Sequence, residues 1–452
     1  MKYFVLILIV LNIALQGNAQ FGMPSFRDVA HAFFASYTHN SNESIIRFYR
    51  KKDGWHVCKD RYANPENYFD DTLFWSSAKQ SYLQLSFPVF TGTSTEIEDK
   101  VQAYLISINF DYDEYQFERT VYYGYPGWDW DIIQESNNFK NKGDTLLESC
   151  ARAFSNYAAG FITDQFGKPF LNNDPDRKPV NPKSPTSNSK KEKFVRYYLK
   201  AIDAYSKLSI QNPAYETRVG NIKIKLANEY MFMYTELLMS ADMIKARQYA
   251  AKASYNDSLL NMGKQFLDSV PLNSILITGG DNDTYPLWYL QEIKEYRTDV
   301  LVLNYNMLGA KRYLLAMNQK SSTPLFKVKD TTFLRANFDY FLFANSTDNQ
   351  QKIPLSTFLD DIATQNNPFG KIDVLYENET LRSYYSKQIF FQKSEHSARI
   401  FFPVGRFLLR ADFMLLDLLL TNQNRPIYST TLLPIIANAL DKTESGIYRV
   451  VF

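Results

Sequence analysis

The chain has 452 residues, of which 45% are hydrophobic and 22% are charged, a composition typical of globular proteins. The 50 Lys and Arg residues nearly balance the 48 Asp and Glu residues, which argues against nucleic acid or an anionic lipid surface as the partner. Aromatic residues make up 16% of the chain, enough apolar surface to offset ordering entropy, so disorder over most of its length is excluded.

Residues 1–19 have the features of a secretory signal peptide. Lys2 supplies the positive charge, an apolar run follows, and Gly17 and Ala19 are the small residues expected before cleavage at Gln20. The residue immediately after the cleavage point is not a cysteine, so we expect no lipid anchor. The sequence therefore predicts an exported protein, periplasmic or associated with the outer membrane, with no transmembrane segment after signal cleavage.

The cysteine and histidine content is low. Cys58 and Cys150 allow one disulfide in an exported protein, but two buried free thiols agree with the sequence at least as well. The 4 histidines have no spacing of the HExxH or CxxC type, so a zinc enzyme is not expected.

The segment 20–167 is expected to be an N-terminal α/β domain. Two strands flank an Asp-Gly turn typical of a hairpin, alternation of apolar and polar residues predicts two more, and apolar residues at helical spacing predict one helix. The strands are expected at Ser44–Arg50, Trp55–Cys58, Tyr82–Phe90 and Val101–Phe110, and the helix at Asp144–Phe161.

A linker rich in Pro, Ser and Lys is expected over residues 168–193, followed by helical hairpins over 194–270. The order of Ala201, Tyr205, Leu208 and Pro213 gives this region a weak tetratricopeptide character without a strict repeat. The hairpins are either a spacer or a peptide-binding groove. Their helices are expected at Phe194–Leu208, Tyr215–Leu238, Ile244–Tyr255 and Leu259–Val270.

Strands and helices alternate from residue 271 onward, which predicts a C-terminal α/β domain over 271–452 with parallel, Rossmann-like strands. The chain is thus expected to be a multi-domain α/β protein. The first elements are expected at Ser274–Thr278, Thr284–Tyr296, Asp299–Asn304 and Leu308–Met317, and a later strand at Ile427–Thr431.

The loop after the first of these strands is the main candidate site, with the residues Gly279, Gly280, Asp281, Asn282, Asp283 and Thr284. Ligands bind at the carboxyl ends of parallel strands, and carboxylate and carbonyl oxygens suit Ca²⁺ or sugar hydroxyls. A structural role is equally consistent, with Asp283 or Thr284 capping the next helix and Pro286 in its first turn. No phosphate-binding or serine-hydrolase motif is present in the sequence.

These residues also carry a family resemblance. Residues 274–308, with GGDNDTYPLWYLQE and RTDVLVLNYNML, resemble the C-terminal soluble region of bacterial glycosyltransferase-like membrane proteins related to protein O-mannosyltransferases, which contain a domain of unknown function. The pattern continues through NRPIY and ESGIYRVV, so it covers about 271–452. In that family the acid for glycosyl transfer lies in the membrane half, so the resemblance implies a shared exported module and not glycosyl transfer.

Two further candidates lie outside the loop. Arg425 precedes the strand at Ile427 and could donate to a ligand carboxylate, or tie down Asp281 or Asp283. An aromatic platform of Tyr125, Trp128 and Trp130 could stack against a sugar, although burial in a turn is the simpler explanation.

The sequence therefore predicts a non-catalytic module of the bacterial envelope that binds a glycan, a cation such as Ca²⁺, or an envelope protein partner, with no other cofactor. The alternative is a periplasmic glycan-processing enzyme that uses Asp281 and Asp283. Carboxylates two residues apart seldom reach the roughly 5–9.5 Å separation needed across a glycosidic bond, which counts against the enzyme.

Overall fold

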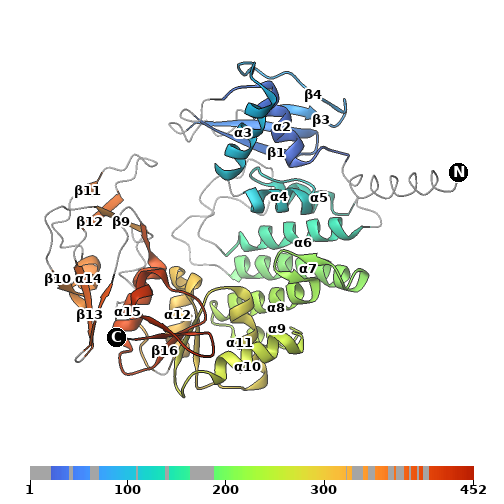
Figure 1. Ribbon diagram of the computed structural model, residues 1–452. Coiled ribbons are helices and arrows are strands. Elements are labelled where there is room, and N and C mark those ends of the chain that lie inside the picture. Colours follow the sequence, from blue (N-terminus) through green and yellow to red (C-terminus); the bar gives the residue numbers. More distant parts are fainter. Residues whose placement is uncertain are drawn as a thin grey trace. The chain divides into compact units, whose positions relative to one another are not determined.

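The computed structural model, drawn as a ribbon in Figure 1, divides into two compact units, Met1–Ile222 and Lys223–Phe452. The division falls inside the region where helical hairpins were expected. The expected signal peptide and most of the expected linker lie outside the described residues. The structure describes residues 22–39, 44–61, 71–107, 110–137, 142–162, 188–321, 323–327, 340–344, 352–364, 371–372, 381–385, 388–393, 396–400 and 407–451.

The first unit contains a four-stranded antiparallel sheet in the order β1-β2-β3-β4. Its strands are β1 (Ser44–Lys51), β2 (Gly54–Arg61), β3 (Asp71–Ser76) and β4 (Ser81–Tyr82). The predicted Asp-Gly hairpin is confirmed, since Lys51 pairs with Gly54. Gly54 has φ +144°, and a Cβ there would lie 1.9 Å from the carbonyl oxygen of Trp75, so only glycine fits.

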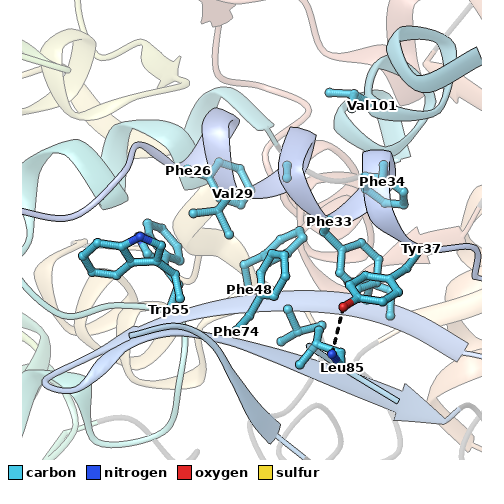
Figure 2. Close-up of a cluster of buried hydrophobic side chains, with 14 of the residues drawn as sticks. Phe26, Val29, Phe33, Phe34, Tyr37, Phe48, Trp55, Phe74, Leu85 and Val101 are labelled. Carbon is cyan, nitrogen blue, oxygen red and sulfur yellow. Dashed lines mark hydrogen bonds between the residues drawn. The ribbon is translucent and has the colours of Figure 1, made fainter. Parts of the chain in front are cut away.

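An aromatic core lies between this sheet and helix α2 (Phe26–Ser36), as Figure 2 shows. Phe33 of α2 meets Phe48 and Phe74 of the sheet edge-on, with ring centroids 5.7 and 6.0 Å apart. The Tyr37 hydroxyl accepts a hydrogen bond of 2.8 Å from the main-chain N–H of Leu85. Many aromatic residues of the N-terminal part of the sequence therefore lie in this core.

Two strand predictions in this unit are wrong. Of the strand predicted at Val101–Phe110, residues 101–107 lie in helix α3 (Ser94–Ser107) and Phe110 begins helix α4 (Phe110–Arg119). The strand predicted at Tyr82–Phe90 is also absent, because the short strand β4 ends at Tyr82 and residues 83–90 form no strand. Val101 and Leu105 are both buried, and residues four apart share one face of a helix.

The helices that follow are mostly as expected. The predicted helix at Asp144–Phe161 is confirmed, and it packs along its successor, which begins six residues earlier than expected. The predicted helix start at Tyr215 is wrong, because a short hairpin precedes the next helix. The elements of the first unit are α5 (Trp128–Glu135), α6 (Asp144–Ala159), α7 (Asn188–Gln211), β5 (Glu216–Thr217) and β6 (Gly220–Asn221), and α8 (Ile222–Leu238) opens the second unit.

Cys58 and Cys150 are free and buried, so they form no disulfide.

The second unit contains a five-stranded mixed sheet in the order β17-β18-β16-β7-β8. The predicted parallel pairing is confirmed for the interior strand β7 (Ile275–Thr278), which is parallel to β8 (Leu301–Asn304) and to β16 (Ile427–Ser429). The strands β17 (Leu440–Lys442) and β18 (Tyr448–Val450) are antiparallel. Ile275, Leu276 and Ile277 are fully buried, as expected for an interior parallel strand.

Helix α11 (Asp281–Lys294) connects β7 to β8, and it starts three residues earlier than predicted. The helix predicted at Leu308–Met317 is a 3₁₀ turn followed by a shifted α-helix. The remaining helices of this part are α9 (Met243–Ala250), α10 (Asp257–Asp268), η2 (Tyr305–Gly309) and α12 (Lys311–Lys320).

The later part of the unit adds two small sheets and helices α14 (Leu355–Thr364) and α15 (Arg410–Thr421), with a 3₁₀ segment η4 (Pro434–Ala439). Its strands are β9 (Tyr340–Ala344), β10 (Lys352–Pro354), β11 (Lys371–Ile372), β12 (Leu381–Tyr385), β13 (Gln388–Lys393), β14 (His396–Ile400) and β15 (Phe407–Leu409). Among the helices that the structure describes, none combines the length and apolar character needed to cross a bilayer.

Candidate functional site

The loop singled out in the sequence forms the first turn of helix α11. Gly280 occupies the N-cap position, so the expectation that Asp283 or Thr284 caps the helix is wrong. Pro286 is the sixth helical residue and lies beyond the first turn where we expected it. The helix starts early because the Thr284 hydroxyl donates to the Gly280 carbonyl at 2.7 Å, which fastens the first turn.

Thr284 anchors this turn to the sheet. Its side chain is fully buried, and its hydroxyl lies 2.6 Å from that of Thr278 and accepts a 2.9 Å hydrogen bond from the Asn304 amide. Thr278 and Asn304 are the last residues of β7 and β8. Thr284 is therefore part of the structural link between α11 and the carboxyl ends of the strands.

Asn282 joins the same turn to helix α8. The Asn228 amide donates to the Asn282 side-chain oxygen at 2.8 Å, and the Tyr255 hydroxyl donates to the Asn228 oxygen at the same distance. Gly279 accepts a hydrogen bond from the Asn306 amide through its carbonyl. The main-chain and amide oxygens that we expected to meet a ligand are thus engaged within the unit.

Asp281 is exposed at the surface, but neighbouring protein atoms partly desolvate its carboxyl group. Burial and the neighbouring carboxylate of Glu229 raise the pKa of Asp281, and the Lys225 ammonium opposes this shift. Asp281 and Asp283 both lie in the first helical turn, where negative charge is favourable because of the helix dipole. Within the described ranges, no group of three or more His, Cys, Asp or Glu side chains could hold a metal ion.

Arg425 lies at the other end of β7. Its guanidinium donates to the main-chain carbonyls of Asn273 and Ser274, which immediately precede the strand. The structure therefore brings the residues from Gly279 to Thr284 together and places Arg425 apart from them. Burial lowers the pKa of Arg425, and the nearby carboxylate of Asp299 opposes this shift.

Arg425 lines a pocket of about 560 Å³, a volume within the usual range for small-molecule sites. Three cationic side chains, Arg247, Lys320 and Arg425, line it together with two carboxylates, Glu292 and Asp299. No residue of the loop from Gly279 to Thr284 belongs to this pocket. It lies at the amino ends of the strands, opposite to the edge where ligands are usual in open α/β sheets.

Both acids of the pocket are already paired. Glu292 accepts a 3.0 Å hydrogen bond from the Arg247 Nε and a further one from the Lys320 ammonium, and the Lys320 charge contributes to a lowered pKa of Glu292 despite its burial. The Asp299 carboxylate accepts two hydrogen bonds from the Arg297 guanidinium, at 2.9 and 3.0 Å. The side chain of Arg247 remains 63% exposed, so its terminal nitrogens are open to a ligand.

The three aromatic residues of the expected platform are engaged in packing within the first unit. Tyr125 is buried, and its hydroxyl donates to Asp131 at 2.8 Å. Trp130 stacks on Tyr157 with centroids 5.1 Å apart. Trp128 meets Tyr123 edge-on at 5.5 Å. The described contacts favour the burial interpretation of these residues.

The sequence did not reveal Arg247, Glu292 or Lys320 as pocket residues. Arg247 and Glu292 lie 45 residues apart, on helices α9 and α11. A single basic residue on an exposed helical face has no distinguishing local pattern, so no sequence signal marks this cluster.

Comparison with known families gives one finding. A family model described as TMEM260-associated domain 2 matches residues 259–404. The matched segment includes Glu292, Asp299 and Lys320 and overlaps the region with the glycosyltransferase-like resemblance. Its description links the segment to TMEM260 and names no activity. No curated protein and no solved structure matches the chain.

Proposed function

We propose that this protein is a non-catalytic module of the bacterial envelope that binds an acidic sugar in the pocket beside Arg425. The observation that carries the proposal is that Arg425 lines a pocket of about 560 Å³ and donates only to main-chain carbonyls, without a carboxylate at salt-bridge distance among the described residues. A planar guanidinium in such a position suits a ligand carboxylate.

The charge balance of the pocket supports an anionic ligand. Glu292 is neutralised by Arg247 and Lys320, and Asp299 is neutralised by Arg297, which does not itself line the pocket. Arg425 therefore adds a positive charge that these two acids do not compensate. Because the pocket is only partly enclosed, the attraction for a ligand carboxylate will weaken with added salt.

The other lining side chains support a sugar as the carrier of that carboxylate. Amide and hydroxyl groups can exchange hydrogen bonds with ring hydroxyls, while the apolar segment 300–302 can pack against the ring. The polar residues concerned are Asn273, Gln291, Thr298, Ser321 and Thr323. The alternative of a glycan-processing enzyme at Asp281 and Asp283 has less support, because both acids lie in one helical turn and the pocket lies elsewhere.

Binding of glucuronate measured by calorimetry tests the proposal. We expect saturable binding of glucuronate, at least tenfold weaker binding of glucose, and at least tenfold weaker glucuronate binding by Arg247→Gln. Lys245→Gln is the matched control, because Lys245 is an exposed cation on the same helix and does not line the pocket. Equal binding of glucose and glucuronate, or equal losses in the two variants, would overturn the proposal.

Three finer assignments belong to the same proposal. Parallel pairing of β7 with β8 and β16 supports a Rossmann-like class for 271–452. Burial of Ala201, Tyr205 and Leu208 supports weak tetratricopeptide character in the helical region. Kinship with the glycosyltransferase-like family is proposed from the sequence resemblance alone, which overlaps the segment matched by TMEM260-associated domain 2. Cell fractionation tests the envelope location. Recovery of this protein in the cytoplasmic fraction, with the expected signal peptide still attached, would contradict it.

A further inference from the structure

The free edge of strand β1 in the first unit presents main-chain groups to a cavity. β1 is the edge strand of its sheet, and Lys51 pairs with Gly54 where the hairpin closes. Arg50 exchanges main-chain hydrogen bonds of 2.9 and 3.0 Å with Tyr123 on the side away from β2. Because these directions alternate along an antiparallel strand, the N–H and C=O groups of Phe48 and Ile46 also point to the free edge.

Hydrogen-bond partners within the unit occupy both ends of this free edge. At one end Tyr123 pairs with Arg50, and at the other the Tyr104 hydroxyl donates to the Ile46 carbonyl at 3.2 Å. Between them, the N–H and C=O of Phe48 have no hydrogen-bond partner among the residues that the structure describes. Unpaired main-chain groups of this kind invite a ligand that offers both an acceptor and a donor.

A cavity of about 380 Å³ lies along this edge. Six aromatic residues contribute to its walls, together with one cation and one carboxylate, Arg47 and Asp113. The aromatic residues are Phe26, Phe48, Tyr49, Tyr104, Phe117 and Tyr123. Aromatic walls with a few polar groups are typical of small-ligand sites, and aromatic faces suit the apolar faces of sugar rings.

Gly124 lies beside the Phe48 carbonyl, where a side chain would not fit. It has φ +99°, and a Cβ at this position would lie 2.9 Å from the Phe48 carbonyl oxygen and 3.0 Å from Tyr49. Any other residue would therefore be strained and would crowd the same carbonyl. A side chain at this position would fill the space beside the Phe48 carbonyl at the wall of the cavity.

We propose that this cavity binds an N-acetylated sugar, whose acetamido group pairs with the main-chain N–H and C=O of Phe48. The acetamido carbonyl accepts from the Phe48 N–H, and its N–H donates to the Phe48 carbonyl. The sugar hydroxyls meet Arg47 and Asp113, and the methyl group and ring lie against the aromatic walls.

The length of the open edge favours a single amide over an extended peptide. Strand addition requires hydrogen bonds along several residues of an edge. Here Tyr123 already occupies the edge at Arg50, and Tyr104 already occupies the Ile46 carbonyl, which leaves one residue between them. Peptide binding is therefore an outcome that the experiment distinguishes.

The ligand series for the test is N-acetylglucosamine, glucosamine, glucose and the blocked peptide acetyl-Ala-Ala-Ala-amide, titrated into the full chain by calorimetry or by changes in tyrosine and tryptophan fluorescence. We expect saturable binding of N-acetylglucosamine and at least tenfold weaker binding of glucosamine and glucose, because only the first carries the amide. Equal binding of the three sugars, no binding of any of them, or tighter binding of the peptide would overturn the proposal.

Two variants locate the binding. Arg47→Gln removes an exposed charge that lines the cavity, and we expect at least a threefold loss of N-acetylglucosamine affinity. Lys79→Gln, an exposed cation that does not line the cavity, is expected to bind normally. Gly124→Ala is expected to abolish binding, and if it does not fold, the Arg47 comparison still decides. Equal affinities of Arg47→Gln and Lys79→Gln would contradict the assignment.

Discussion

The indole N–H of Trp288 donates to the main-chain carbonyl of Val302 across 3.2 Å. Val302 lies in β8, an edge strand of the mixed sheet, and two other side chains bond to main-chain groups in or immediately before this strand. The Gln291 amide donates to the Val300 carbonyl at 2.7 Å, and the Tyr313 hydroxyl accepts from the Asn304 N–H at 2.9 Å. Side chains of α11 and α12 thus bond to main-chain groups of an edge that could otherwise pair with another strand.

Trp288→Phe is expected to lower the free energy of unfolding by about 1–3 kcal/mol beyond the loss of ring volume, because it leaves a buried carbonyl without its donor. Trp130→Phe is the matched control, since the Trp130 indole nitrogen has no hydrogen-bond partner among the described residues. Urea unfolding curves of both variants provide the measurement. Equal destabilisation would show that the Trp288 hydrogen bond contributes nothing.

Glu236 is expected to make stability depend on pH. Burial raises the pKa of Glu236 to about 7, although Arg312 donates to its carboxylate at 3.2 Å. A carboxyl group with a raised pKa in the folded state stabilises the fold fully below its unfolded pKa of about 4.5, and this contribution is lost as the pH rises through about 7. The full effect is on the order of 3 kcal/mol.

Glu236→Gln removes this titration. Between pH 4.5 and pH 8 the wild type should lose stability relative to the variant by an amount of that order, measured by urea unfolding at each pH. Arg312 retains the Ser240 hydroxyl as a partner at 2.9 Å, so the variant is expected to fold. Parallel stability curves for the two proteins would rule out a raised pKa at Glu236.

Arg50 is expected to be the most costly cation to remove from the first unit. Its side chain is buried and donates to the carbonyls of Phe117, Thr120 and Val121, at and just beyond the end of helix α4. Arg50→Met leaves these carbonyls without their donor and should cost roughly 3 kcal/mol. The exposed Lys79→Gln should change stability by less than about 0.5 kcal/mol. Similar losses in both variants would contradict this account.

The two cysteines are expected to react only after unfolding. Cys58 and Cys150 are free and no more than 1% exposed, and burial raises the pKa of the Cys150 thiol, which lowers the fraction of reactive thiolate. A colorimetric thiol assay without reductant should detect no thiol in the native protein and two in denaturant. Detection of none in denaturant would reveal a disulfide.

Local patterns in the sequence predicted local structure well. The Asp-Gly turn predicted the β1–β2 hairpin, and apolar runs predicted β7, β8 and β16, because each of these features depends on residues close in sequence. The wrong strand at Val101–Phe110 arose because Val101 and Leu105 fit both periods over a short run. Only their burial on one face of α3 distinguishes the helix.

The candidate site was less predictable because it depends on contacts between distant residues. The segment from Gly279 to Thr284 was correctly placed after a parallel strand, yet its hydrogen bonds to Asn228 and Asn304 could not be inferred from the sequence. Arg425 lies about 150 residues from Asn273 and Ser274, whose carbonyls it binds. No local pattern showed which end of β7 it would occupy.

We propose that the ligand site lies beside Arg425 and not at the first turn of α11. Calorimetric titration of glucuronate into the wild type, Arg247→Gln and Asp281→Ala tests it most directly. The account predicts that Asp281→Ala binds as the wild type does and that Arg247→Gln loses at least tenfold in affinity. Loss of binding in Asp281→Ala with full binding in Arg247→Gln would contradict the account and return the site to the loop.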